Sequence, residues 1–221
     1  MENKNFGIFN NFTLKMIAII TMVIDHVGLI FFPTVPVFRA IGRIAFPIFC
    51  FLIVEGFYHT RSHLNYLIRL SIFAVLSEIP FDLAFQNTLF DWSHQNVFFT
   101  LALGLLAIFC LEEMNTNKKF AIPLLLTWAA ADILHCDYGV WGVLLICIFY
   151  VTRETPWVRF VLFTLMLYVG YIYFDLLEHY ALIAMLPITL YNGKRGPSTK
   201  MIFYWFYPLH LLVLYGLATY L

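Results

Sequence analysis

The sequence predicts an all-α fold, a bundle of about nine membrane-spanning helices. Three observations predict it: 62% of the 221 residues are hydrophobic, only 12% are charged, and long apolar runs recur from Thr13 to Leu221. Soluble proteins average about 45–50% apolar and about 25% charged residues. Helices are expected because backbone groups in lipid must be satisfied internally, and because the runs lack the alternating polarity of barrel strands.

Nine segments are apolar over roughly the 20 residues that a spanning helix needs, or somewhat fewer. They lie near residues 13–32, 38–57, 64–84, 95–111, 119–135, 139–152, 157–174, 179–191 and 201–220. Eight or ten spans would also fit, since the fifth and sixth segments are short and a tight turn at Asp137 to Gly139 joins them. No polar stretch between them is long enough to fold separately, so residues 1–221 are expected to form a single membrane domain.

The basic residues indicate the orientation of this domain. With nine spans, all of the 13 lysines and arginines except Arg39 and Arg43 fall on one side. Cytoplasmic loops carry an excess of basic residues, so the N terminus is expected in the cytoplasm.

The 13 acidic residues balance the 13 basic ones, so the net charge gives no electrostatic case for nucleic-acid binding. The four cysteines are scattered without metal-ligand spacing, so they are expected to pack in the core, with no metal site.

Ionisable side chains recur inside the predicted spans, where a charge costs about 2.5–3.5 kcal/mol and indicates a functional site. At about 1.5 Å per residue, most fall in the outer half of a span or near mid-depth. They are Asp25 and His26 in the first span, Arg39 and Arg43 in the second, Glu78 and Asp82 in the third, Asp132 and His135 in the fifth, and His210 in the ninth. These positions are compatible with one polar cavity that opens outward or reaches mid-membrane.

Residue spacing places several of these side chains on shared helix faces. The pairs three or four residues apart are Arg39 with Arg43, Glu78 with Asp82, Asp132 with His135, and Tyr207 with His210. Such faces are expected to point into the bundle, where Arg39 and Arg43 would pair with a carboxylate among Asp25, Glu78, Asp82 and Asp132. For any single pair, a structural salt bridge that clamps the bundle is the alternative.

His26 is the leading candidate for a catalytic base. Histidine exchanges a proton near neutral pH, and a carboxylate bonded to one ring nitrogen raises the basicity of the other. Adjacent helical residues diverge by about 100°. The orienting carboxylate is therefore either Asp25 or one from another helix, with Asp25 then serving Arg39 or Arg43. The alternative is a histidine satisfied within the bundle.

Two further features lie toward the predicted cytoplasmic side. Glu55, near that end of the second span, either lines a route from the cytosol or is an interfacial carboxylate. The basic loop from Lys194 to Lys200 suits a phosphorylated cofactor, although the rule that places basic loops in the cytoplasm already accounts for its charge. It lacks the strand and the residue order of a P-loop.

These residues lie in motifs that resemble the TraX family. The motifs are Lys15 to Gly28 with Asp25-His26, Arg39-Ala-Ile-Gly-Arg43-Ile-Ala-Phe-Pro47, Glu55-Gly56-Phe57, Ser77-Glu78-Ile-Pro80-Phe-Asp82, Asn96-Val-Phe-Phe-Thr100-Leu-Ala-Leu-Gly104, Asp132 and Tyr207-Pro208-Leu-His210. Each motif is weak alone, but together they are specific and spread over nearly the whole chain. The segment from about Leu145 to Met185 adds little.

The resemblance carries expectations about activity. The TraX family includes the protein that acetylates the N terminus of conjugative pilin, and its membrane plan is similar to that of acyltransferases that acetylate sugars. The resemblance therefore implies acetyl-CoA as donor, an amine or hydroxyl acceptor on a peptide or glycan, and the inner membrane of a bacterium. His26 matches the catalytic histidine proposed in those relatives. Arg39 and Arg43 match paired arginines that would hold cofactor phosphates or a substrate carboxylate.

The expected function is thus a membrane-embedded acetyltransferase. His26 and Asp25 are the predicted catalytic residues. The predicted substrate- and cofactor-binding residues are Arg39, Arg43, Glu55, Glu78, Asp82, Asn96, Asp132, His135, Tyr207 and His210. One alternative is a small proton-coupled transporter, although the sequence lacks a matched pair of interrupted half-helices. The other is a non-catalytic assembly factor for surface appendages.

Overall fold

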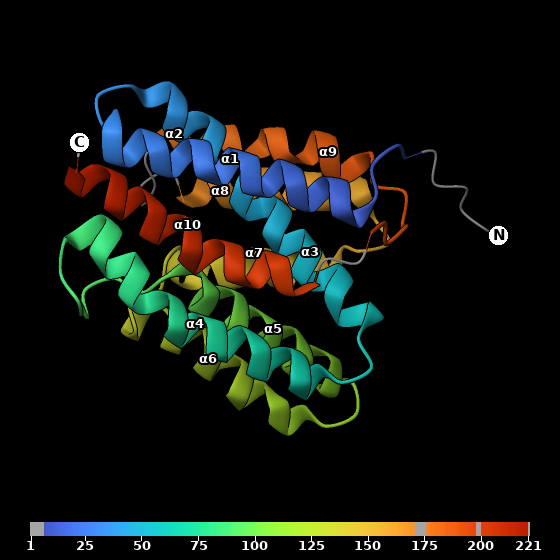
Figure 1. The fold of residues 1–221 in the computed structure, drawn as a ribbon. Helices are drawn as coiled ribbons and strands as arrows, with labels where there is room; N and C mark the ends of the chain where they lie inside the picture. The colour runs from blue at the N-terminus through green and yellow to red at the C-terminus, as the bar shows by residue number, and fades with distance from the viewer. Residues whose placement is uncertain (1–6, 171–175, 198–199, 221) are drawn as a thin grey trace. The chain divides into compact units, whose positions relative to one another are not determined.

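The computed structural model describes residues 7–170, 176–197 and 200–220, and helices dominate these ranges (Figure 1). The elements are α1 (Asn11–Phe31), α2 (Pro36–Gly42), α3 (Ala45–His59), α4 (His63–Gln86), α5 (Val97–Glu113), the short 3-10 helix η1 (Lys118–Phe120), α6 (Ala121–Ile133), α7 (Gly139–Val151), α8 (Pro156–Val169), the 3-10 helix η3 (Leu176–Ala184), α9 (Met185–Thr189) and α10 (Lys200–Tyr220). The only β-pairing in the described ranges is two isolated bridges, Phe9 with Tyr191 and Gln95 with Cys136. The predicted all-α fold is therefore confirmed.

The chain divides into two compact units, each built from two stretches of sequence. The first unit consists of residues 1–52 and 152–201, and the second of residues 53–151 and 202–221. The first therefore holds α1, α2, the start of α3, α8, η3 and α9. The second holds the rest of α3, α4 to α7 and nearly all of α10. The single membrane domain expected from the sequence stays a prediction.

Within the first unit, α1 packs along α2, and η3 contacts α2, α8 and α9. The carboxamide oxygen of Asn10 accepts a hydrogen bond from the backbone N–H of Thr13 at 2.9 Å and so caps α1. Gly42 sets the spacing between α1 and α2, because a Cβ atom at this position would overlap the side chain of Asp25. The two helices therefore approach as closely as they do only because residue 42 lacks a side chain.

The second predicted span is not one uninterrupted helix. α2 ends at Gly42, and Arg43 and Ile44 form a turn before α3 begins. Pro47 explains the break, because proline has no N–H and cannot bond to the carbonyl of Arg43 four residues earlier.

The eighth predicted span, 179–191, was expected as an ordinary helix, but the structure has a 3-10 helix, η3, followed by the short α9. Hydropathy predicted both apolar runs but not their local backbone hydrogen bonding.

The helices have the composition of a membrane protein. Three helical segments in the described ranges are long and apolar enough to cross a bilayer: Asn11–Phe31, Pro36–His59, which comprises α2 and α3, and Met201–Tyr220. α4 falls outside that set, yet it exposes a series of large apolar side chains: Leu64, Ile68, Ile72, Val75, Leu76 and Ile79. Soluble monomers rarely expose contiguous apolar patches of this kind. The count of nine spans and the cytoplasmic N terminus stay predictions.

Within the second unit, α5 contacts α4, α6 and α7, and Tyr204 of α10 stacks on Phe73 of α4 with ring centroids 5.0 Å apart. α6 and α7 are joined by the tight turn that the sequence predicts. His135, Tyr138 and Gly139 adopt positive φ angles of 52°, 63° and 48° there. Cys136 in this turn forms a parallel bridge with Gln95, which fixes the turn against the start of α5.

Candidate functional site

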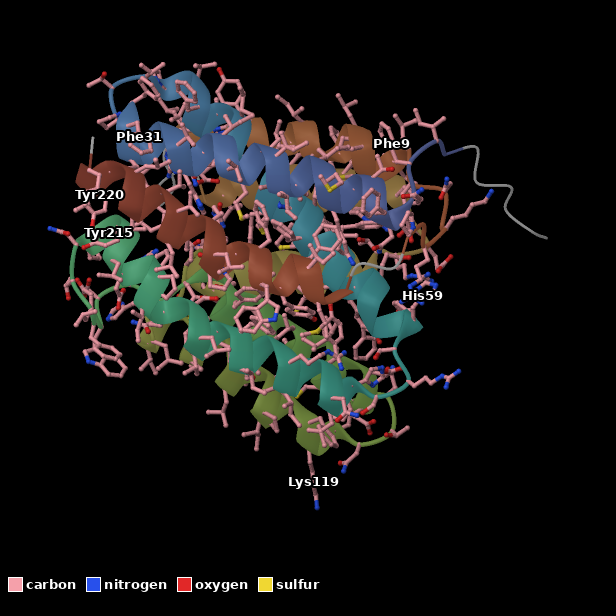
Figure 2. All side chains as sticks on the ribbon, in the orientation of Figure 1. Phe9, Phe31, His59, Lys119, Tyr215 and Tyr220 are labelled. Atoms are coloured by element: carbon pink, nitrogen blue, oxygen red, sulfur yellow. The ribbon has the colours of Figure 1, made fainter. Side chains whose placement is uncertain are left out.

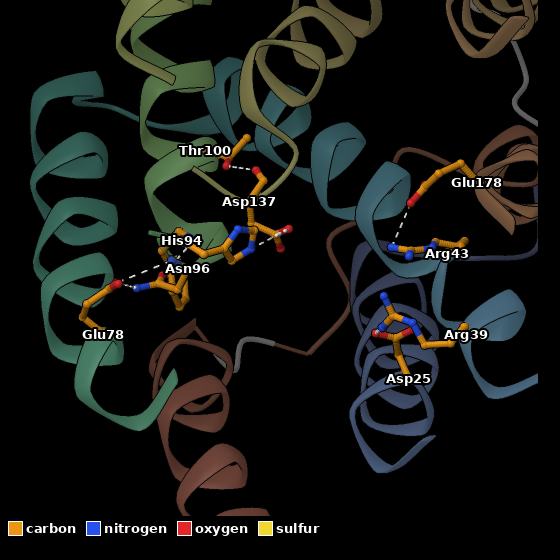
Figure 3. A network of polar contacts seen from close by, with 10 residues as sticks. Asp25, Arg39, Arg43, Glu78, His94, Asn96, Thr100, Asp137 and Glu178 are labelled. Carbon is orange, nitrogen blue, oxygen red and sulfur yellow. Dashed lines mark hydrogen bonds and ion pairs between the residues drawn. The ribbon is translucent and has the colours of Figure 1, made fainter. Parts of the chain in front are cut away.

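Asp25 on α1 and Arg39 on α2 form an ion pair in the first unit, in which the guanidinium donates a hydrogen bond to the carboxylate (Figure 3). Their side chains are 14% and 25% exposed. The pair is possible because Gly42, close to Arg39 on α2, leaves room for the Asp25 side chain. One of the partnerships that the sequence predicts, Asp25 with Arg39, is therefore present.

Arg43 pairs with a carboxylate that the sequence did not point to. Its guanidinium lies 2.9 Å from the carboxylate of Glu178 on η3, and these side chains are 13% and 14% exposed (Figure 3). The carboxylates expected opposite Arg39 and Arg43 were Asp25, Glu78, Asp82 and Asp132, so the pairing of Arg43 with Glu178 was not predicted. Glu178 lies just before a predicted span, in the segment with the least family resemblance. The only signal for it was that a buried arginine requires a carboxylate from some other helix.

His26 follows Asp25 directly on α1 and is partly buried. The first unit thus holds the candidate catalytic base beside a carboxylate that is engaged with Arg39. Glu55, in contrast, belongs to the second unit. It lies on α3, is only 5% exposed, and its backbone carbonyl lies 2.8 Å from the Nδ1 atom of His59.

A second polar group joins α4 to the start of α5. The carboxamide of Asn96 donates to the Glu78 carboxylate and, at 2.8 Å, to the backbone carbonyl of Ala74 (Figure 3). Its oxygen accepts from the N–H of Phe98 at 3.0 Å and so caps α5. Asn96 is completely buried, and every polar atom of its side chain is bonded. Asn96 therefore fixes Glu78 while also starting α5.

The loop before α5 contributes a histidine and a carboxylate contact that sequence reasoning missed. The Nε2 atom of His94 lies 3.5 Å from the carboxylate of Asp137, whose backbone carbonyl accepts a hydrogen bond from Thr100. Hydrogen bonding to Asp137 raises the pKa of His94, although burial opposes the shift. One oxygen of Asp82, which is completely buried, accepts from the N–H of Asp91 at 2.8 Å. Loop residues gave no sequence signal because they lie outside the apolar runs.

The remaining predicted residues also fall in the second unit. The ring of Tyr207 meets that of Phe98 edge-on at 5.2 Å and that of His210 at 5.5 Å, so the shared face predicted for Tyr207 and His210 is present. Asp132 accepts a hydrogen bond from the N–H of Val140 at 2.8 Å. Its neighbour on the predicted face, His135, is exposed in the α6–α7 turn.

Comparison with known proteins places these residues in a family. The family model described as TraX protein matches residues 11–218. The chain belongs to the TraX family. It is 32% identical to the probable fimbrial assembly protein FimC, serogroup H1, of Dichelobacter nodosus, over 93% of this chain and 94% of that protein. It is also 30% identical to an uncharacterized protein of Rickettsia prowazekii (strain Madrid E), over 57% of this chain and 49% of that protein. No solved structure matches.

The TraX match therefore includes both polar groups, that of Asp25, Arg39 and Arg43 in the first unit and that of Glu78, Asp82 and Asn96 in the second. Each arginine of the first group is already held by a carboxylate, so the group is fixed in place and nearly neutral. Among the described residues, no three His, Cys, Asp or Glu side chains are placed to hold a metal ion.

Cysteine chemistry has little support in this TraX-family chain. All four cysteines are free thiols and buried. Burial raises the pKa of Cys136, in the α6–α7 turn, to about 11. A thiol with that pKa stays protonated at neutral pH and is a poor nucleophile.

Proposed function

We propose that this TraX-family chain is a membrane-embedded acetyltransferase that moves an acetyl group from acetyl-CoA to an amine or hydroxyl of an extracytoplasmic or membrane-associated acceptor. The observation that carries the proposal is the Asp25–Arg39 ion pair beside His26. It supplies a proton acceptor, a fixed cation and an organising carboxylate within one pair of packed helices. A positioned proton acceptor and a fixed positive charge are both means by which enzymes catalyse acyl transfer.

In the proposed reaction, His26 takes a proton from the acceptor nitrogen or oxygen as that atom attacks the thioester carbonyl. The new C–N or C–O bond forms, the C–S bond breaks, and the departing thiolate of coenzyme A receives the proton from His26. Direct transfer is the simpler route, and a transiently acetylated histidine is the alternative. Either route leaves acetylated acceptor and free coenzyme A.

Arg39 and Arg43 are suited to stabilise the charge that develops on the thioester oxygen. Each guanidinium is held in place by a carboxylate, Asp25 or Glu178. A donor that is fixed before the reaction stabilises a transition state without reorganising. The same carboxylates lower the net positive charge, which disfavours the alternative role of binding cofactor phosphates, since these carry several negative charges.

The relative from Dichelobacter nodosus suggests the acceptor. That protein is named a probable fimbrial assembly protein, and it matches over nearly the full length of both chains. We therefore favour a fimbrial subunit as the acceptor, with a cell-envelope glycan as the alternative. The same name also favours a second function, non-catalytic assistance in fimbrial assembly.

The test compares His26→Gln with wild type in lipid nanodiscs, using acetyl-CoA and a purified fimbrial subunit and measuring the release of free coenzyme A thiol. We expect His26→Gln to bind acetyl-CoA but to lose about 10²- to 10⁴-fold in transfer rate, the usual contribution of a general base. His179→Gln, which changes an exposed histidine on η3, is the matched control and should retain activity.

Two results would reject the acetyltransferase. The first is folded wild type that binds neither acetyl-CoA nor coenzyme A in calorimetry. The second is His26→Gln that transfers acetyl at the wild-type rate. Assembly without catalysis would be supported if fimbriae still formed in cells carrying His26→Gln while no acetyl transfer could be measured with either protein.

A further inference from the structure

One end of the first unit is strongly basic. It is formed by residues 9–15, 152–159 and 190–197, and we refer to it as the basic end. Its charged residues are Lys15, Arg153, Glu154, Arg159, Lys194 and Arg195, five basic and one acidic. Glu154 pairs with Arg153, and its side chain is 81% exposed. Because basic residues outnumber acidic ones in these segments, the basic end carries a net positive charge.

Specific contacts hold the three segments of the basic end together. The backbone N–H of Asn11 donates to the carbonyl of Lys194 at 2.8 Å, and Phe9 forms a bridge with Tyr191. Figure 1 accordingly shows the start of α1 beside the chain that follows α9. These contacts tie the loop that carries Lys194 and Arg195 to the N-terminal end of α1.

Arg159 ties the third segment to the same end. Its guanidinium donates to the carbonyls of Thr152 and Arg153 at 3.2 and 2.8 Å. It also lies over the ring of Phe51, with 5.3 Å to the ring centroid. Phe51 in turn meets Tyr191 edge-on at 5.3 Å. The convergence of the three segments is therefore built into the packing of this unit.

The basic end and the two ion-paired arginines differ in their surroundings. Arg39 and Arg43 each contact a carboxylate, and their side chains are mostly buried. Lys194 and Arg195 are exposed. Phosphate groups carry full negative charges, so a polyphosphate is attracted to the net positive charge of the basic end, and it reaches exposed side chains there more readily than arginines that are mostly buried.

The length of α1 gives the separation along the helix between the basic end and His26. Asp25 lies fourteen residues after Asn11, which corresponds to about 20 Å along the helix at about 1.5 Å per residue. In coenzyme A, the extended pantetheine arm separates the thioester sulfur from the phosphates. A donor lying along the first unit could therefore place its phosphates at the basic end and its thioester at the level of His26.

We infer that the basic end, through Lys194 and Arg195, binds the phosphate groups of the acyl donor, and that Arg39 and Arg43 do not. This inference rests on the proposed function. It assigns a ligand group to a surface for which membrane topology alone would explain the charge.

The test measures binding of coenzyme A and of S-acetylpantetheine, which carries the thioester but no phosphate, to the full chain in zwitterionic nanodiscs. The variant is Lys194→Gln with Arg195→Gln. Its matched control is Lys118→Gln with Lys119→Gln, an exposed basic pair on η1 of the second unit. Figure 2 shows Lys119 pointing away from the ribbon.

We expect the Lys194 and Arg195 variant to weaken coenzyme A binding about ten- to hundredfold, as for lost charge-assisted hydrogen bonds. Its binding of S-acetylpantetheine should be unchanged, and the salt dependence of coenzyme A binding should flatten. The control pair should bind both ligands as wild type does. Equal weakening of both ligands, or of the control pair, would overturn the inference.

Two other outcomes would also overturn it. The variant could bind coenzyme A like wild type while a folded Arg39→Gln variant loses that binding, which would return the phosphates to the ion-paired arginines. Alternatively, anionic lipid added to the nanodiscs could raise the melting temperature of wild type only, with coenzyme A affinity equal in both proteins. The basic end would then hold lipid headgroups.

In both cases wild type still binds coenzyme A, so the proposed function survives. Only failure of wild type to bind coenzyme A would reject both the inference and the proposed function.

Discussion

The guanidinium of Arg43 lies 2.9 Å from the carboxylate of Glu178, and both side chains are nearly nine-tenths buried. The two residues are far apart in sequence, on the turn after α2 and on the 3-10 helix η3. Because α2 contacts η3 within the first unit, the pair fastens the C-terminal third of the chain to its N-terminal third. An ion pair in such surroundings depends strongly on both partners, since a lone charge left there loses its compensation.

Glu178→Gln should therefore destabilise the protein by about 3 kcal/mol, the lower end of the range for removing one partner of a buried pair. The measurement is the free energy of unfolding by sodium dodecyl sulfate titration of detergent-solubilised protein. Glu154→Gln is the control, because its pair with Arg153 is exposed and should contribute less than about 1 kcal/mol. Equal effects of the two substitutions would show that the Arg43–Glu178 pair does not stabilise the fold.

Gly42→Ala should destabilise the protein by about 1–3 kcal/mol, the usual range for overpacking. The added methyl group would overlap the Asp25 side chain and push it away from Arg39. Gly216→Ala on α10 meets no atom within 4 Å and should instead stabilise its helix by up to about 1 kcal/mol. Melting temperatures of the two variants should shift in opposite directions, and a shift of the same sign in both would contradict the close approach of α1 and α2.

Asn96→Ala should cost about 2–4 kcal/mol, because it removes the cap of α5 and leaves buried groups of Glu78 and Ala74 without their donor. The hydroxyl of Ser62 caps α4 by accepting a hydrogen bond from the N–H of Asn65 at an exposed site. Ser62→Ala removes this cap and should cost about 1 kcal/mol. Both free energies follow from the same detergent titration. If Asn96→Ala cost no more than Ser62→Ala, Asn96 would be only a cap.

Stability should depend on pH through His94. Its contact with Asp137 raises the pKa of His94 in the folded protein, so the folded state binds the proton more tightly than the unfolded state. The stabilisation is complete below the ordinary histidine pKa of about 6.5 and is lost as the pH rises through the raised pKa. Melting temperature measured across this range should fall more in wild type than in Asp137→Asn. Identical profiles would show that the His94–Asp137 contact is not formed in solution.

The sequence by itself determined the helices and where most of them begin and end. Apolar runs are a property of the local sequence and indicate segments that favour a hydrocarbon environment, so the ranges of α1, α4, α5 and α10 agree with the predicted spans within a few residues. Family motifs also marked Asp25, Arg39 and Asn96, whose side chains are engaged in polar contacts. Pro47 accounts for the break between α2 and α3, but the prediction from hydropathy treated the two helices as one span.

Only the tertiary structure decided which side chains meet. The partner of Arg43 was chosen by the packing of η3 against α2, and that of His94 by the turn before α7. These contacts join residues distant in sequence, and they depend on helix rotation and on loop paths that no local pattern encodes. The close approach that Gly42 allows is of the same kind, since a glycine in an apolar run shows its role only when the facing helix is in place.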